Sequence, residues 1–167
     1  MARFQELLRS LNNLKLLGAI GRSGGDLGNV ADLVDNFLGS PQMQACVQRF
    51  RALPGGAELM DGRYPPLQPD IDRLIQLPPG TLGRRYAELI RQLGYDPEFF
   101  RPRPTDTDER WLTQRIATTH DIHHVVAGFG TEPQGESGVL AITAAQIGFP
   151  AYVLLNGAAQ LGSFRFQ

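Results

Sequence analysis

The sequence has very little cysteine and no long apolar run. Cys46 is the only cysteine among 167 residues, which excludes a disulfide framework within the chain and fits a reducing compartment. Its helical sequence context predicts a small core residue rather than a nucleophile. No stretch reaches the roughly 18–20 unbroken apolar residues of a membrane span, and the first 21 residues resemble no signal peptide. A cytoplasmic protein is expected.

Positive charge is not in excess either. The formal net charge is −1, which argues against nucleic acid as the main partner. Lys15 is the only lysine, so arginine supplies nearly all the positive charge. Arginine suits the recognition of carboxylates and phosphates, although a compositional bias of the source genome explains the same excess.

What the chain does have is apolar residues at helical spacing, with no convincing alternating strand. An amphipathic helix is expected over residues 3–20, and its apolar stripe is interpreted as core, with a membrane-facing or partner-facing stripe as the alternative. The Pro- and Gly-rich residues 53–70 are expected to form a loop. Further helices are expected over residues 26–38, from Pro41, after Asp70, from Thr81, over residues 106–127 and after Glu136, where Pro150 breaks or kinks the last segment. The sequence therefore predicts an all-α fold, a single domain over residues 1–167 with about six or seven helices.

All three histidines lie in one stretch, "HDIHHVVAGFGTEPQGE", residues 120–136. In a helix of 3.6 residues per turn, His120, Asp121 and His124 point into an arc of about 100°, whereas His123 points away. Glu136, in the first turn of the next helix, is the candidate for a further ligand, because the helix dipole favours a carboxylate there. The alternative is two ordinary helix histidines and an ordinary first-turn carboxylate.

This donor set mixes nitrogen and oxygen atoms. It suits Zn²⁺, with Fe²⁺ or Mn²⁺ as alternatives, while Mg²⁺ normally prefers fewer imidazoles. A zincin would need Glu where Asp121 stands, and a His-Asp phosphohydrolase would need a histidine well before His120. A ferritin-like di-iron site requires two Glu-x-x-His elements. One metal ion between two consecutive helices is therefore the simplest prediction.

The motif His120-Asp121-x-x-His124, followed after eleven residues by Glu136, resembles the signature of the ubiquinone-biosynthesis family called coenzyme Q biosynthesis protein four. The segment "LPPGTLGRRYAELI", residues 77–90, resembles another of that family's motifs. The segment "DLGNVADLVD" and the small-residue helix ending in "GFP" also occur in the expected order. The resemblance extends over most of the chain.

This resemblance implies an all-α protein, peripherally associated with a membrane, that takes part in making a polyprenylated benzoquinone. It implies removal of the C1 carboxylate of a polyprenylated hydroxybenzoate, coupled to hydroxylation there, and a role in organising the other quinone-biosynthesis enzymes. The ligands of the divalent ion, generally taken to be zinc, would be His120, Asp121, His124 and Glu136. Because the chain starts directly at its first helix, a bacterial cytoplasmic source is expected rather than a mitochondrial one.

Small residues after Glu136 bear on the substrate. They either permit close helix packing or leave a groove for an isoprenoid tail: Gly138, Ala141, Ala144, Ala145 and Gly148. A non-catalytic carrier of a polyprenylated or isoprenoid lipid, in which Arg84, Arg85 or Arg115 assists an anionic head group, is one alternative to an enzyme, and a pure assembly protein is another. A homodimer is left open. No flavin, haem or nicotinamide motif is present, so an oxidant would be O₂ or come from elsewhere.

Overall fold

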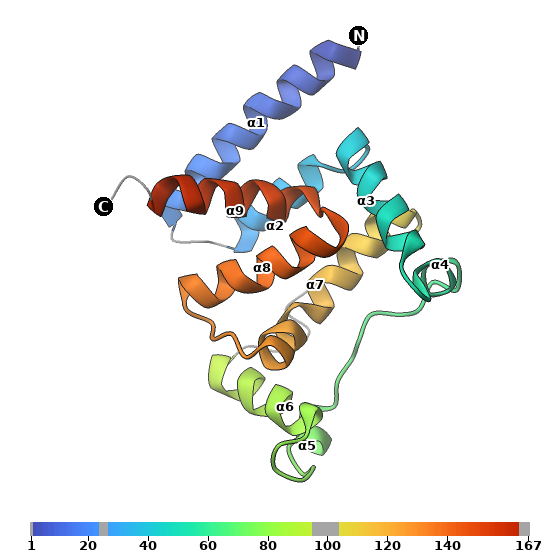
Figure 1. Ribbon diagram of the computed structural model, residues 1–167, viewed down its shortest axis with the longest axis vertical. Coiled ribbons are helices and arrows are strands. Elements are labelled where there is room, and N and C mark those ends of the chain that lie inside the picture. The colour runs from blue at the N-terminus through green and yellow to red at the C-terminus, as the bar shows by residue number, and fades with distance from the viewer. Residues whose placement is uncertain (1, 24–26, 95–103, 164–167) are drawn as a thin grey trace. The chain divides into compact units, whose positions relative to one another are not determined.

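The structure is a computed structural model that describes residues 2–23, 27–94 and 104–163. Within these ranges it contains helices and no strands, so the predicted all-α class is confirmed, although these residues form nine helices rather than the predicted six or seven (Figure 1). The helices are α1 (Ala2–Ser23), α2 (Leu27–Asn36), α3 (Pro41–Ala52), α4 (Gly56–Asp61), α5 (Ile71–Leu74), α6 (Leu82–Leu93), α7 (Asp108–Ala127), α8 (Pro133–Ile147) and α9 (Pro150–Ser163). None of the helices described is long and apolar enough to cross a membrane.

Helix α4 corrects the expectation that residues 53–70 form only a loop. Its sequence begins with glycine, which ordinarily weakens a helix. Here Gly56 is buried, and a Cβ atom at this position would overlap the carbonyl oxygen of Phe50. The glycine is required by the close approach of the chain after α3. This close approach, to a carbonyl only six residues earlier, depends on the exact turn after α3, which residue types alone do not specify.

The other boundaries follow local capping rules. Thr81 and Thr107 precede α6 and α7, and the hydroxyl oxygen of each accepts a hydrogen bond from a backbone N–H of the first turn. Gly94 and Gly128 end the same two helices with φ angles of 69° and 72°. This left-handed conformation favours glycine. The side chain of Ser40 caps α3 in the same way as the two threonines.

The chain divides into two compact units. Unit 1 consists of Met1–Ala57 and Leu140–Gln167, and its buried side chains include Leu33, Met43, Cys46 and Phe149. Unit 2 is Glu58–Val139, with Tyr86, Ile90, Trp111 and Leu112 among its buried side chains. The single domain over residues 1–167 remains an expectation.

The predictions that Cys46 and the apolar stripe of α1 lie in the core have different outcomes. Cys46 is buried, and burial raises the pKa of its thiol to about 12, which confirms the inert core residue. The core interpretation of the α1 stripe is wrong over residues 4–14, where the large apolar side chains are exposed: Phe4, Leu7, Leu8, Leu11 and Leu14. The polar side chain of Asn13 is buried in their place. Local periodicity identifies an apolar face but does not determine which face packs against the rest of the unit.

Candidate metal centre

The centre lies within unit 2, where α7 ends and α8 begins. His120 and His124 are four residues apart on α7, so their side chains lie on one face of the helix. Gly128 ends α7 in the left-handed conformation, and its N–H donates to the carbonyl of His124 at 2.9 Å. The chain then reverses within a few residues, and Glu136 stands in the first turn of α8, as predicted.

The ligand atoms of three side chains converge. His120 Nε2 lies 3.1 Å from Glu136 Oε2, and His124 Nε2 lies 3.3 Å from Glu136 Oε1. The two imidazole Nε2 atoms are 3.2 Å apart. Donors at about 2.0–2.1 Å from a tetrahedral Zn²⁺ are themselves separated by about 3.3–3.4 Å. The spacing and the chemistry of this donor set therefore fit a divalent metal ion.

The orientation of His124 also fits a ligand. Its side chain is almost fully buried, and Nδ1 lies 2.9 Å from the carbonyl oxygen of Gly130 and 3.3 Å from that of Phe129. A carbonyl only accepts, so Nδ1 carries the proton and donates it. Nε2 therefore faces His120 and Glu136, and its lone pair becomes available to a metal ion when Nε2 gives up its proton. Metal-bound histidines are commonly held in this way by a backbone carbonyl.

The carboxylate of Glu136 is kept ionised. Burial alone would raise its pKa, but the hydrogen bond with His120 and the charges of His120 and His124 outweigh burial and lower the pKa below its ordinary value. An ionised carboxylate is the form that binds a cation.

Asp121 and His123 lie outside this group. The three residues whose ligand atoms lie within 4.8 Å of one another are His120, His124 and Glu136. Asp121 is half-buried and close enough to Tyr86 that its charge adds to burial in raising the pKa of that phenol. His123 is half-buried, and burial, followed by the charges of the two neighbouring histidines, lowers its pKa. Ligation by Asp121 therefore stays a prediction.

The turn between the helices depends on glycines that the sequence analysis did not assign to the site. A Cβ at Gly135 would overlap the carbonyl oxygen of Gly130, and a Cβ at Gly138 would lie 2.9 Å from the ring of Phe129. These close approaches hold in place the carbonyl group that orients His124. The density of glycine in "GFGTEPQGESG" was the signal that could have indicated a tightly packed turn.

The three arginines considered for an anionic head group have partners inside unit 2. Arg84 pairs with Glu88 at 2.9 Å and also donates to the carbonyl of Leu77. Arg85 lies 3.9 Å from Glu88, and Arg115 donates to the carbonyl of Pro65 at 3.3 Å. Their contacts support the interpretation as ordinary helix side chains.

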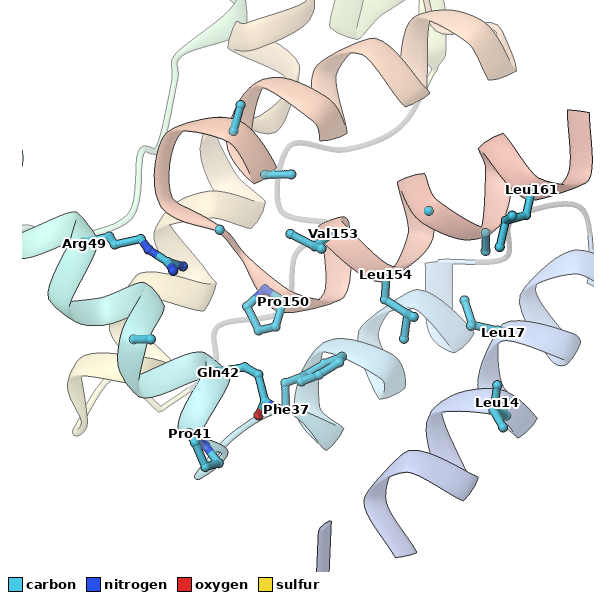
Figure 2. A pocket seen from close by; sticks show the side chains of 16 residues that line it. Leu14, Leu17, Phe37, Pro41, Gln42, Arg49, Pro150, Val153, Leu154 and Leu161 are labelled. Carbon is cyan, nitrogen blue, oxygen red and sulfur yellow. The ribbon is translucent and has the colours of Figure 1, made fainter. Parts of the chain in front are cut away.

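Unit 1 contains a separate feature, an open and mainly apolar cavity of about 1320 Å³. Leucines from α1 and apolar side chains from α9 line it, as Figure 2 shows for Leu17, Val153 and Leu154. Ala144, Ala145 and Gly148 also line it, and these belong to the small residues from which a groove was predicted. Arg49 and Gln42 are its polar lining residues. An isoprenoid occupant stays a prediction.

Comparison with known proteins gives the family. The family model described as "Coenzyme Q (ubiquinone) biosynthesis protein Coq4" matches residues 28–167. The chain belongs to the Coq4 family. The matched range includes the metal-centre residues, and membership of the Coq4 family supports a role in ubiquinone biosynthesis.

Sequence similarity to individual Coq4 proteins supports the same family. The chain is 30% identical over 126 residues to the mitochondrial ubiquinone biosynthesis protein COQ4 homolog of Homo sapiens, covering 71% of this chain and 47% of that protein. It is 33% identical over 87 residues to mitochondrial COQ4 of Eremothecium gossypii, covering 51% of this chain and 27% of the relative. The chain thus spans less than half the length of these two curated Coq4 relatives.

A solved structure supports the Coq4 fold. A crystal structure from Nostoc punctiforme PCC 73102, of a protein described as belonging to ubiquinone biosynthesis, matches with a TM-score of 0.78 and 30% sequence identity. The match covers 89% of this chain and 69% of the Nostoc chain.

Proposed function

We propose that this protein acts in prenyl-quinone biosynthesis by removing the C1 carboxylate of a polyprenylated hydroxybenzoate and placing a hydroxyl group on the same carbon. In this reaction the C1–carboxylate bond breaks and carbon dioxide leaves, water supplies the new hydroxyl oxygen, and two electrons with two protons pass to dioxygen, which leaves as hydrogen peroxide. The observation that carries the proposal is the convergence of His120, His124 and Glu136 on one point. Asp121 is proposed as a fourth ligand on the strength of the motif.

A divalent ion, with Zn²⁺ preferred and Fe²⁺, Mn²⁺ or Mg²⁺ as alternatives, would supply Lewis acidity at this point, stabilising negative charge as the C1–carboxylate bond breaks. The contribution of the chain itself is to orient the metal-binding side chains and to keep them in the protonation state that binds a cation. The Gly130 carbonyl fixes the tautomer and ring orientation of His124. The imidazoles keep Glu136 ionised, despite the burial that opposes its charge.

The test compares two histidines of the same helix. We expect His124→Ala to lose both bound metal and turnover of a prenylated hydroxybenzoate, while His123→Ala, which removes an imidazole outside the ligand group, keeps both. Elemental analysis measures the metal, and release of carbon dioxide from a C1-labelled substrate measures turnover. Full turnover by a metal-free His124→Ala protein would end the catalytic proposal.

A second candidate is a non-catalytic prenyl-lipid-binding scaffold that organises other quinone-biosynthesis enzymes. The apolar cavity of unit 1 favours it, because the cavity volume suits a long apolar tail. Each 100 Å² of prenyl surface removed from water contributes about 2.5 kcal/mol. Native mass spectrometry of purified protein discriminates the two candidates. Co-purified lipid without any turnover supports the scaffold, and turnover of the hydroxybenzoate supports the enzyme.

We further propose peripheral attachment to a membrane, because a polyprenylated substrate resides in the bilayer. The test is flotation of the purified protein with lipid vesicles that carry a polyprenylated aromatic lipid. Protein that stays at the bottom of the gradient with every vesicle composition contradicts this attachment.

A further inference from the structure

Helix α1 exposes its most apolar side chains. Five large residues of this helix are each 51–66% exposed: Phe4, Leu7, Leu8, Leu11 and Leu14. In Figure 1 the N-terminal half of α1 extends away from the other helices of unit 1. An ordinary surface helix turns such a stripe toward the core and its polar residues toward water.

The polar side of α1 is the side that packs. Asn36 of α2 donates to the side-chain oxygen of Asn13 at 2.7 Å and to the carbonyl oxygen of Arg9 at 3.2 Å. The Asn12 side chain in turn donates to the side-chain oxygen of Asn36 at 3.1 Å. These hydrogen bonds fix the rotation of α1 about its axis. The apolar stripe is therefore held outward by the fold of the protomer, and its last leucine, Leu14, also lines the open cavity of unit 1.

The exposed stripe has the spacing of a helix-pairing seam. Its members alternate by three and four residues, and two glycines continue the series: Phe4, Leu7, Leu11, Leu14, Gly18 and Gly21. This is the a/d pattern of a two-helix coiled coil. Each glycine in a helix costs about 1 kcal/mol relative to alanine, and the described residues of the protomer give no packing reason for either one. A Cβ at Gly21 would meet nothing within 4 Å, and at Gly18 it would approach only the flexible end of Arg22.

We propose that a second copy of this chain covers the stripe, with the two α1 helices packed antiparallel across a two-fold axis. In that arrangement each large residue near one end of the helix lies opposite a glycine near the other end. The layers, from the ends to the centre, pair Phe4 with Gly21, Leu7 with Gly18, and Leu11 with Leu14. The stripe is thus self-complementary, as a two-fold interface requires.

The exposed stripe extends over more than two turns of α1, which suits a specific contact with another helix. The five side chains are each more than half exposed, and pairing must bury about 1,000 Å² in total to reach the lower limit for a specific interface. A membrane surface explains the pattern less well. An interfacial helix keeps its polar face toward water and head groups, whereas here Asn36 and α2 occupy that face. Glycines within the seam would also reduce the area inserted into lipid.

Charge substitution tests the pairing. Analytical ultracentrifugation of the full chain is expected to show a dimer, and Leu14→Glu is expected to raise the dissociation constant at least tenfold. Leu82→Glu replaces an equally large, half-exposed leucine of α6 in unit 2 and is expected to leave the dimer intact. Circular dichroism confirms that both variants keep their helix content. A monomeric wild-type chain at about 100 μM overturns the proposal.

A bulky substitution separates a second copy from a lipid surface. Gly21→Leu has room in the protomer but places a side chain against Phe4 of the second copy, so we expect it to weaken the dimer. On a membrane the same change would strengthen binding to vesicles of phosphatidylcholine and phosphatidylglycerol. A wild-type chain that stays monomeric and floats with these vesicles, more strongly as Gly21→Leu, assigns the stripe to the membrane and overturns the proposal.

Cross-linking tests the orientation. The double variant Phe4→Cys/Gly21→Cys is expected to oxidise to a covalent dimer, because the two positions are opposite each other only in an antiparallel pair. Phe4→Cys alone is expected to stay uncoupled, since its two copies would be about 26 Å apart along the axis. Efficient coupling of the single variant would show a parallel pair and contradict the proposed arrangement.

Discussion

Replacing Glu136 by glutamine tests the metal centre through protein stability. The change keeps the shape of the side chain but removes the negative charge from one of three converging ligands. In metal-free protein its effect is small, because this side chain is 41% exposed and water screens its pairing with His120. In the presence of metal the charge is expected to matter much more, since a cation between two imidazoles needs an anionic ligand to neutralise part of its charge.

The size of the expected effect follows from the coupling between metal binding and folding. An ion present at about 100 times its dissociation constant stabilises the folded protein by about 2.7 kcal/mol. For a chain of this size that corresponds to an increase in Tm of roughly 5–11 °C. Loss of a ligand is expected to weaken metal binding by 100-fold or more, a larger effect than that of removing a residue that only orients a ligand through a hydrogen bond. Such a loss removes most of the metal-dependent increase in Tm.

The assay is thermal unfolding with zinc or with chelator, for wild type, Glu136→Gln and a matched control. Glu88→Gln provides the control, because Glu88 is also 41% exposed and also pairs with a cationic side chain, yet it lies on α6 outside the ligand group. Wild type and Glu88→Gln are expected to show the full zinc-dependent increase in Tm. An equal increase in Glu136→Gln would refute the assignment of this carboxylate as a ligand.

Three further predictions follow from the same contacts. The pKa of Glu136 is lowered in the folded state, so its stabilising contribution is present above the unfolded pKa and is lost as the pH falls through the folded pKa; acid titration of metal-free wild type should therefore show a loss of stability that E136Q lacks. Gly135→Ala places a Cβ on the carbonyl oxygen of Gly130 and should cost about 1–3 kcal/mol in urea unfolding, whereas Gly157→Ala meets open space in α9 and should be neutral or slightly stabilising; equal effects would contradict the tight turn. Burial raises the pKa of Cys46 to about 12, so the thiol should react with iodoacetamide at pH 8 only after unfolding, and rapid labelling of the folded protein would contradict its position in the core.

Much of unit 2 is local in origin and was therefore predictable. Thr81, Thr107 and Gly94 cap or end helices as their residue types require. The approach of His120 to His124 also follows from helical geometry, since four residues complete about one turn. The position of Glu136 was also predictable from the sequence, because the turn between α7 and α8 is short and its length limits where the next helix can begin.

The neighbours of Asp121 could not be predicted from the sequence in the same way. Helical spacing places Asp121 within about 100° of the two histidines around the axis of α7. This range of directions also includes side chains that face α6. In the structure its charge acts on Tyr86. Which neighbour an intermediate side chain meets depends on the helix packed beside it, and this packing is a property of segments distant in the sequence.

The sequence by itself determined the helices, their caps and a pair of histidines with one carboxylate in reach, because these features depend on interactions within a few residues. Only the folded structure decided three other features: that α2 turns the leucines of α1 outward, that Gly56 approaches the carbonyl oxygen of Phe50, and that the Gly130 carbonyl orients His124. Each depends on a hydrogen bond or a close approach set by how the chain packs. The energy of such a contact depends on the distance and angle between the two groups. The sequence determines these only through the complete fold.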